Sequence, residues 1–309
     1  MRTPSRIALS ASTICQLNCP LCTVSYRKNG KADANGPGWG HLKFIDFKKL
    51  LDQNPQIRSA ELSWKGEIFL NPELKNIIEY AYKRGVELRA DRGVNLNNVS
   101  KDTLECLVKY KFKSLTISLD GASQKVYKIY RRNGDFNRVK KNIIIINYFK
   151  NKYSSELPYL TWQFIIFGHN EHEILKAKRF AACLGMKFKT RLSWDSTYSP
   201  AKNAYSREGF AKKYGHDYLS YACKDLITSP VINYDGMLFG CCENDRTSFG
   251  NVFKNGLSKC LSSKEYSRMI GVAFGIFKSS KDIPCYYCKI YKNNSGGMDQ
   301  KRIKRGICG

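Results

Sequence analysis

The sequence predicts an α/β protein in which parallel strands alternate with helices. Segments typical of strands and of amphipathic helices alternate about six times between residues 7 and 193. Alternation of this kind implies right-handed crossovers between parallel strands. The segments with chemically reactive residues also fall where expected strands end, which is where ligands bind in such folds. An open doubly wound sheet and a partial barrel both fit these observations.

The expected strands are short apolar runs, and they cover residues 7–10, 60–64, 86–90, 115–119, 160–167 and 188–193. The expected helices have apolar residues at helical spacing, and they cover 46–52, 74–84, 101–110, 123–130, 139–150 and 171–184. Residues 196–222 are polar and contain Pro and Gly, so a linker or loop is expected there. The cysteine-rich segment that follows contains a hairpin-like stretch at 229–242 and a helix at 263–270, and residues 293–309 are expected to form a mobile tail.

The chain of 309 residues has a net charge of +26, from 52 Lys and Arg against 26 Asp and Glu. One interpretation is a polyanionic partner, such as a nucleotide sugar, a phosphorylated substrate, an acidic peptide or nucleic acid. The other is AT-rich codon usage with dispersed, solvated charge, since the basic residues cluster only at Lys301–Arg305. An apolar content of 42% excludes a disordered composition.

The twelve cysteines are more than a protein of this kind usually carries. The first residues contain no long apolar run, and the longest aliphatic stretch, Ile143–Ile146, is too short to cross a bilayer. We therefore expect a cytoplasmic protein with no membrane span, in which metal binding or catalysis, not disulfides, explains the cysteines.

Cys15, Cys19 and Cys22 follow the first expected strand with the spacing C-x3-C-x2-C. Three thiolates on one loop can hold three irons of a [4Fe–4S] cluster and leave the fourth open to a ligand. A zinc site would need a fourth nearby ligand, and no His or Cys follows Cys22 before His41.

This spacing resembles the signature of the radical S-adenosylmethionine (SAM) superfamily, and three further segments are similar to that family. LSWKGEIFLNPEL resembles the GGE-type motif that holds the SAM amino group, with Gly66 and Glu67 at the matching positions and Lys65 in place of the first glycine. ISLDGASQKVYKIYRRNGDF places Ser118 and Arg131 where the family contacts SAM, and FGHNEHEILKAKRFAACLG resembles the turn and helix after the fifth strand. The resemblance implies a partial (β/α)6 TIM-like barrel that uses a [4Fe–4S] cluster and SAM.

The late cysteines resemble the SPASM/twitch subgroup of that superfamily. Cys223, Gly236 and Cys241 fit its opening motif, and Cys285 and Cys288 continue it. Asn294 and Met298 stand where a full SPASM domain has further cysteines, which implies the shorter twitch form with one auxiliary [4Fe–4S] cluster on Cys223, Cys241, Cys285 and Cys288. Cys242 is an alternative to Cys241, and a structural zinc on these thiols is an alternative to the cluster.

Apart from Cys242, the cysteines outside the two groups and the four histidines are not expected to bind metal. Cys106 and Cys183 lie on apolar helix faces and are expected to be core thiols. Cys308 is a candidate hydrogen-atom donor, as an epimerase of this superfamily would require. The histidines show no ligand spacing and are assigned no role; they are His41, His169, His172 and His216.

The resemblance implies a metal-binding enzyme, a radical SAM oxidoreductase or isomerase. The sequence resembles 2-deoxy-scyllo-inosamine dehydrogenase-like and anaerobic sulfatase-maturating-like enzymes. We expect dehydrogenation or epimerisation of a sugar, cyclitol or nucleotide-linked sugar, with a flavodoxin or ferredoxin as electron donor. One auxiliary cluster, the start of the chain close to the first strand and the basic surface motivate this choice. Peptide or protein side-chain modification is the alternative, and a basic zinc-ribbon nucleic-acid-binding protein is a remote one. The expected domains are a barrel over 1–195, a linker over 196–222 and an auxiliary-cluster domain with tail over 223–309.

Overall fold

The computed structural model describes residues 3–28, 36–202, 206–219 and 223–295. Cys308 and the basic segment 301–305 lie outside the described residues. Among the described helices, none is long and apolar enough to cross a membrane.

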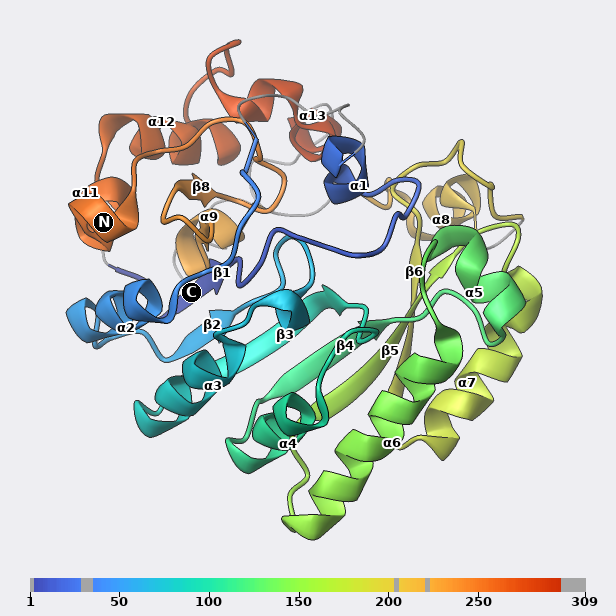
Figure 1. Ribbon diagram of the computed structural model, residues 1–309. Helices are drawn as coiled ribbons and strands as arrows, with labels where there is room; N and C mark the ends of the chain where they lie inside the picture. The colour runs from blue at the N-terminus through green and yellow to red at the C-terminus, as the bar shows by residue number, and fades with distance from the viewer. Residues whose placement is uncertain (1–2, 29–35, 203–205, 220–222, 296–309) are drawn as a thin grey trace.

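One open sheet organises the molecule, and its first six strands are parallel neighbours in chain order (Figure 1). A doubly wound sheet reverses its strand order at a switch point, whereas this order never reverses, so the parallel part is a partial barrel. The predicted fold class is confirmed. These strands are β1 (Arg6–Leu9), β2 (Ser59–Glu61), β3 (Glu87–Val94), β4 (Ser114–Ser118), β5 (Tyr159–Ile166) and β6 (Lys187–Leu192).

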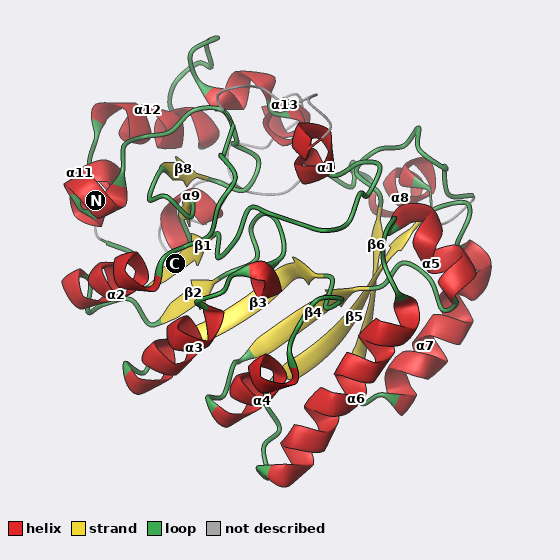
Figure 2. Ribbon diagram, in the orientation of Figure 1, coloured by secondary structure: helices red, strands yellow, loops and turns green. Residues whose placement is uncertain are grey.

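Helices cover one face of this sheet, and the loop after β1 crosses the other face (Figures 1 and 2). The helices of the barrel are amphipathic, and their apolar stripes pack on the strands. They are α2 (Phe44–Gln53), α3 (Leu74–Lys83), α4 (Lys101–Lys109), α5 (Gln124–Tyr130), α6 (Phe136–Lys152) and α7 (Ile174–Cys183). A short helix, α1 (Thr23–Lys28), follows the first cysteine loop and was not expected from the sequence.

Several of these helices begin after a residue whose side chain caps the first turn. Ser100 accepts a hydrogen bond from the backbone N–H of Thr103 at the start of α4, and Asp135 accepts from Arg138 at the start of α6. Such caps satisfy backbone donors that the first turn leaves unpaired. The first residues of these helices could therefore be predicted from the sequence to within a few positions.

The C-terminal region continues the same sheet. β7 (Val231–Ile232) pairs in parallel with β1, with Ala8 opposite Val231, and β8 (Leu238–Gly240) pairs with β7 as an antiparallel hairpin. The hairpin was predicted, but its place beside β1 was not. The remaining helices of this region are α9 (Asp225–Thr228), α10 (Val252–Asn255), α11 (Leu257–Leu261), α12 (Lys264–Ala273) and α13 (Lys289–Ser295).

Two expectations from the sequence need correction. Residues 196–222 were expected to be a linker or loop, and they are not a loop throughout because they contain α8 (Arg207–Tyr214), which Ser206 caps through the N–H of Gly209. That the segment links two domains stays a prediction. Cys183 was expected in the core, but it is exposed. The buried stripe of α7 ends at Ala181, and a residue two positions further on points away from the sheet. Cys106 is half-buried.

Candidate functional site

The loop with Cys15, Cys19 and Cys22 lies beyond the carboxyl end of β1, and backbone hydrogen bonds to two other segments hold it there. The backbone N–H of Thr13 donates to Gly40 O at 3.0 Å, and that of Asn18 donates to Arg132 O at 3.1 Å. The N–H of Cys22 donates to Cys19 O at 3.1 Å, which turns the chain so that α1 begins at Thr23. The structure therefore gathers the three cysteines on one fixed loop.

The thiols of this loop lie in an apolar and partly charged environment. Cys19 is buried and packs in a cluster with Leu17, Leu21, Tyr130, Ile165 and Phe167. Burial raises the pKa of Cys15 to about 12 and that of Cys19 to about 11. Burial therefore favours the protonated thiols. Bound iron would favour the thiolates instead, because a coordinated thiol is deprotonated.

Gly66 packs directly against the loop that leads to Cys15. Its φ is +71°, a conformation that only glycine adopts readily, and a Cβ there would lie 2.4 Å from Ser12 O and 2.8 Å from Ile14 O. The next residue donates its N–H to Ile14 O at 2.8 Å. The predicted GGE-type segment thus supports the cysteine loop from the end of β2.

The side chain of Glu67 is buried between the segments that follow β2 and β3. Its side chain is 1% exposed, and its carboxylate accepts hydrogen bonds from the N–H of Asn95 at 2.6 Å and of Phe69 at 3.5 Å. Burial raises the pKa of Glu67 to about 7. The side chain joins the ends of β2 and β3, and its contact with a cofactor stays a prediction.

Arg131 lies beside the cysteine loop and is fixed there by a buried carboxylate. Its Nε is 2.7 Å from Oδ2 of Asp120, which has no exposed surface, and its Nη1 is 3.8 Å from the sulfur of Cys19. Oδ1 of Asp120 accepts the N–H of Ile165 at 2.7 Å. Burial works against the charge on Arg131, but Asp120 together with Cys19, Tyr130 and Tyr127 more than offsets it, so the pKa of Arg131 stays above its usual value.

Ser118 ends β4 and is buried against Gly93 of β3. A Cβ at Gly93 would lie 2.7 Å from Oγ of Ser118, so the two strands approach closely at this point. Among the predicted site residues of the barrel, the structure therefore brings together the three cysteines, Gly66 and Arg131, and it places Ser118 at the end of the neighbouring strand β4.

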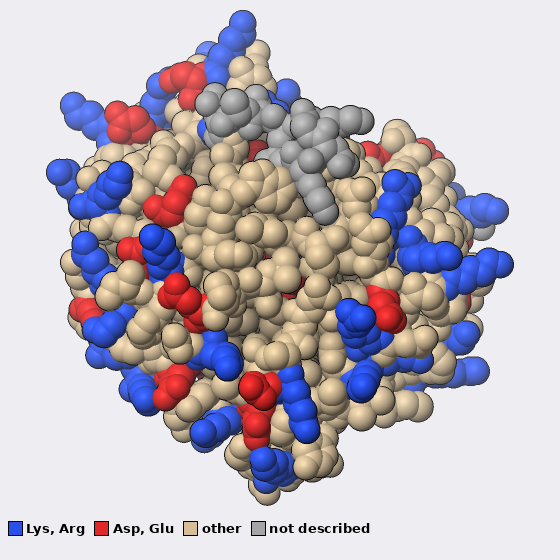
Figure 3. All heavy atoms as spheres, in the orientation of Figure 1, with Lys and Arg blue, Asp and Glu red and all other residues tan. Residues whose placement is uncertain are grey.

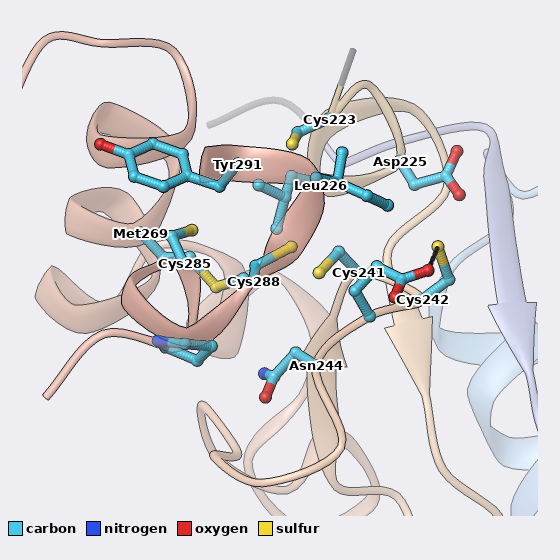
Figure 4. Close-up of a pocket in the computed structure, with 13 residues that line it drawn as sticks. Cys223, Asp225, Leu226, Cys241, Cys242, Asn244, Met269, Cys285, Cys288 and Tyr291 are labelled. Carbon is cyan, nitrogen blue, oxygen red and sulfur yellow. Dashed lines mark hydrogen bonds between the residues drawn. The ribbon is translucent and has the colours of Figure 1, made fainter. Parts of the chain in front are cut away.

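The late cysteines line a cavity of about 210 Å³ (Figure 4). Cys223 precedes α9, Cys285 and Cys288 come from the 3-10 helix Pro284–Tyr287 and its C-terminus, and Cys241 follows β8. Burial raises the pKa of Cys223 to about 12, and the neighbouring thiols of Cys285 and Cys288 add to the effect. The four predicted ligands are thus brought to one cavity from separate segments.

Cys241 and Cys242 point in opposite directions. The sulfur of Cys241 points toward Cys288, whereas that of Cys242 points away (Figure 4) and donates to Oε1 of Glu243 at 3.8 Å. The carbonyl of Cys242 accepts from Nε1 of Trp64 at 3.1 Å. This geometry favours Cys241 as the ligand, as the spacing from Gly236 predicted.

The donor set fits a polynuclear iron–sulfur cluster. The late cysteines surround a space, and in a [4Fe–4S] cluster each thiolate binds a different iron.

The sequence did not indicate the contacts of Lys65. Its Nζ lies 3.4 Å from Oδ2 of Asp245 and 3.1 Å from Oγ1 of Thr23, and its side chain is 14% exposed. Thr23 follows Cys22, and Asp245 follows the Cys241–Cys242 pair. The residue that departs from the GGE-type motif therefore links the segments that carry the two cysteine groups.

Comparison with known proteins agrees with this arrangement. Residues 223–289 match the family model SPASM, an iron–sulfur cluster-binding domain. No match is found among curated protein sequences.

Solved structures share the fold at low identity. Streptococcus suis SuiB bound to S-adenosylmethionine is 17% identical, covers 98% of this chain and 74% of its own, and has a TM-score of 0.67. SuiB bound to precursor peptide SuiA has a TM-score of 0.65 at 16% identity, covering 98% of this chain and 73% of its own. BtrN in complex with AdoMet and 2-DOIA has a TM-score of 0.53 at 12% identity, covering 94% of this chain and 93% of its own.

The match over residues 223–289 confirms the predicted resemblance of the late cysteines to a SPASM iron–sulfur cluster-binding domain. The solved structures share the overall fold of the chain, which agrees with the predicted barrel.

Proposed function

We propose that this chain is a radical SAM enzyme whose Cys15, Cys19 and Cys22 hold a [4Fe–4S] cluster. The observation that carries the proposal is the three-thiol loop at the carboxyl end of β1, with Gly66 packed against it and Arg131 beside Cys19. The SuiB complex with S-adenosylmethionine and the BtrN complex with AdoMet support SAM as the ligand of this site.

When bound, the cluster and SAM supply a 5′-deoxyadenosyl radical that removes a hydrogen atom from substrate. The chain's own residues fix and shield this site. Asp120 orients the guanidinium of Arg131, which we propose meets the carboxylate of SAM. Gly66 and Glu67, with Ser118, hold the rest of that ligand, and the apolar packing around Cys19 excludes water.

The auxiliary cluster is proposed to lie on Cys223, Cys241, Cys285 and Cys288. All four thiols line one cavity, and full ligation leaves no open iron, which suits electron transfer. Strand β7 pairs with β1, the strand that leads to Cys15, and β8, which precedes Cys241, pairs with β7, so one sheet connects the two cysteine groups. A flavodoxin or ferredoxin is the proposed electron donor.

Cys241→Ser is expected to remove the auxiliary cluster, whereas the adjacent Cys242→Ser is expected to retain it. The reason is that only the sulfur of Cys241 points toward the other thiols of the cavity. Iron analysis after anaerobic reconstitution should give about eight irons per chain for the parent and for Cys242→Ser, and about four for Cys241→Ser. The reverse pattern would assign Cys242 as the ligand.

For the substrate, we propose modification of a peptide or protein side chain as the first candidate. The structure of SuiB with its precursor peptide supports it. Dehydrogenation or epimerisation of a sugar or cyclitol, the preference drawn from the sequence, is the second candidate, and the BtrN complex with AdoMet and 2-DOIA supports that alternative.

The test is SAM cleavage by the anaerobically reconstituted enzyme under dithionite. Parent enzyme should release 5′-deoxyadenosine, and Cys19→Ala should reduce this release to background because one iron loses its ligand. Cys183→Ala removes an exposed thiol outside both groups and should cleave SAM at the parent rate. Zinc in place of iron, or unchanged cleavage by Cys19→Ala, would contradict the proposed function.

A further inference from the structure

The edge strand β6 carries a row of three cations at alternate positions. These residues, Lys187, Lys189 and Arg191, are exposed and are called the basic row below. Side chains alternate between the two faces of a strand, so all three lie on one face, and Phe188 and Leu192 lie on the other. On the face that Figure 3 shows, the cations are scattered singly or in small groups, so an aligned row is a distinct feature.

The register of the sheet assigns the basic row to the face that carries the three-cysteine loop. Phe188 lies opposite Trp162, and Trp162 packs on Phe136 of α6, which identifies the helical face. On the other face Arg191 lies opposite Ile165. Ile165 belongs to the apolar cluster around Cys19, so the basic row and the proposed radical site share the inner face of the barrel.

Among the described residues, the basic row has no close ion pair, and the carboxylate of Asp91 acts on Lys189 only as a minor influence on its pKa. None of its three cations forms an ion pair with another residue in the part of the chain that the structure describes. Arg191 donates from Nη1 to Oε1 of Gln163 at 3.3 Å, a neutral partner. Burial lowers the pKa of Lys189, and the charges of Arg191 and Lys187 lower it further. Such a row is suited to an anionic ligand.

The backbone of β6 offers a second means of recognition. β6 is the last strand of the sheet, paired only with β5, and no described strand pairs with its other edge. An open edge presents unpaired N–H and C=O groups, which an extended peptide can pair with as an added strand. The open edge suits an extended peptide and the cations suit carboxylates, so both features favour an acidic, extended peptide.

We propose that an acidic, extended segment of a peptide substrate docks along β6, pairing with its open edge and placing carboxylates on the basic row. This inference rests on the proposed function, because it specifies the substrate class of the same site. Docking there would extend the sheet beyond β6, and every second side chain of the peptide would then lie on the inner face of the barrel.

The test is binding of a fluorescein-labelled peptide of alternating glutamate and threonine to the holoenzyme with SAM, by anisotropy at about 0.15 M salt. A peptide with glutamine in place of glutamate should bind about tenfold more weakly, since three exposed charge pairs are lost. The glutamate peptide with N-methyl groups on alternate residues should also bind more weakly, because it cannot pair with the strand edge.

The matched variants separate a local site from general attraction. Lys187→Glu/Lys189→Glu/Arg191→Glu should weaken binding of the glutamate peptide about tenfold or more. Lys176→Glu/Lys178→Glu/Arg179→Glu makes the same charge change on the exposed surface of α7 and should alter binding by less than about twofold. Equal losses in both variants, equal binding of the glutamine peptide, equal binding of the N-methylated peptide, or displacement of the glutamate peptide by equimolar ATP would each overturn the proposal.

Release of 5′-deoxyadenosine without peptide distinguishes the two proposals. The basic-row variant should cleave SAM at the parent rate in that assay, because the cysteine loop is unchanged. A parent enzyme that binds the acidic peptide as expected but never cleaves SAM would contradict the proposed function and leave the docking site in place.

Discussion

Asp120→Ala is expected to lower the free energy of unfolding by about 3–5 kcal/mol, because it leaves a buried guanidinium without its counter-ion. Arg131 has a side chain only 13% exposed, and its Nε donates to Asp120 at 2.7 Å. The substitution also removes the acceptor for the N–H of Ile165, which is buried. Urea unfolding of the reconstituted protein under anaerobic conditions measures the change through the transition midpoint.

Two control variants separate the lost charge from the lost hydrogen bond. Asp120→Asn keeps an oxygen for the N–H of Ile165 but no negative charge, so it should lose less stability than Asp120→Ala. Asp120→Ala/Arg131→Met removes both charges and should recover part of the stability lost in Asp120→Ala. If the double variant were less stable than Asp120→Ala, the uncompensated guanidinium would not be the cause.

The same substitution should impair the site as well as the fold. Asp120 orients the guanidinium whose Nη1 lies 3.8 Å from the sulfur of Cys19. Without the carboxylate, Arg131 has no fixed direction, and SAM affinity should fall even where the protein is still folded. Asp120 itself was not identified from the sequence, although it directly follows the expected strand 115–119.

Most of the barrel could be predicted from the sequence because its signals are local. Apolar runs mark the strands, and helical spacing with caps such as Ser100 and Asp135 marks the helices. The cysteine loop was recognisable for the same reason, since its three ligands lie within one short segment. The resemblance of residues 223–289 to a SPASM domain was also recognisable, because cysteine spacing is a strong signal on its own.

The contacts that the sequence could not indicate are non-local. Nothing near Val231 specifies that β7 pairs with β1, and nothing near Lys65 specifies that it reaches Asp245. Glu67 matched a motif, but its burial against the N–H of Asn95 depends on how β3 ends. Cys183 was misplaced because the buried stripe of α7 ends two residues before it, at Ala181, which sequence periodicity does not resolve.

Gly66→Ala is expected to lower the free energy of unfolding by about 2–5 kcal/mol and to reduce incorporation of the first cluster. Two costs combine. A residue with a Cβ at φ +71° costs about 1–2 kcal/mol, and the new methyl group overlaps Ser12 O, a backbone atom that cannot rotate away, at a cost of about 1–3 kcal/mol. The overlap pushes on the loop that positions Cys15.

Gly85→Ala isolates the conformational part of that cost. Gly85 has a φ of +67°, nearly that of Gly66, but a Cβ there would meet nothing within 4 Å. It should therefore lose only about 1–2 kcal/mol and should keep the parent's iron content and SAM cleavage. If Gly66→Ala and Gly85→Ala lost equal stability and both retained full iron, the close packing of Gly66 on the cysteine loop would have no energetic consequence. A larger loss confined to Gly66→Ala, with irons missing from the Cys15 site alone, would show that the turn after β2 holds the loop in its ligand-binding conformation.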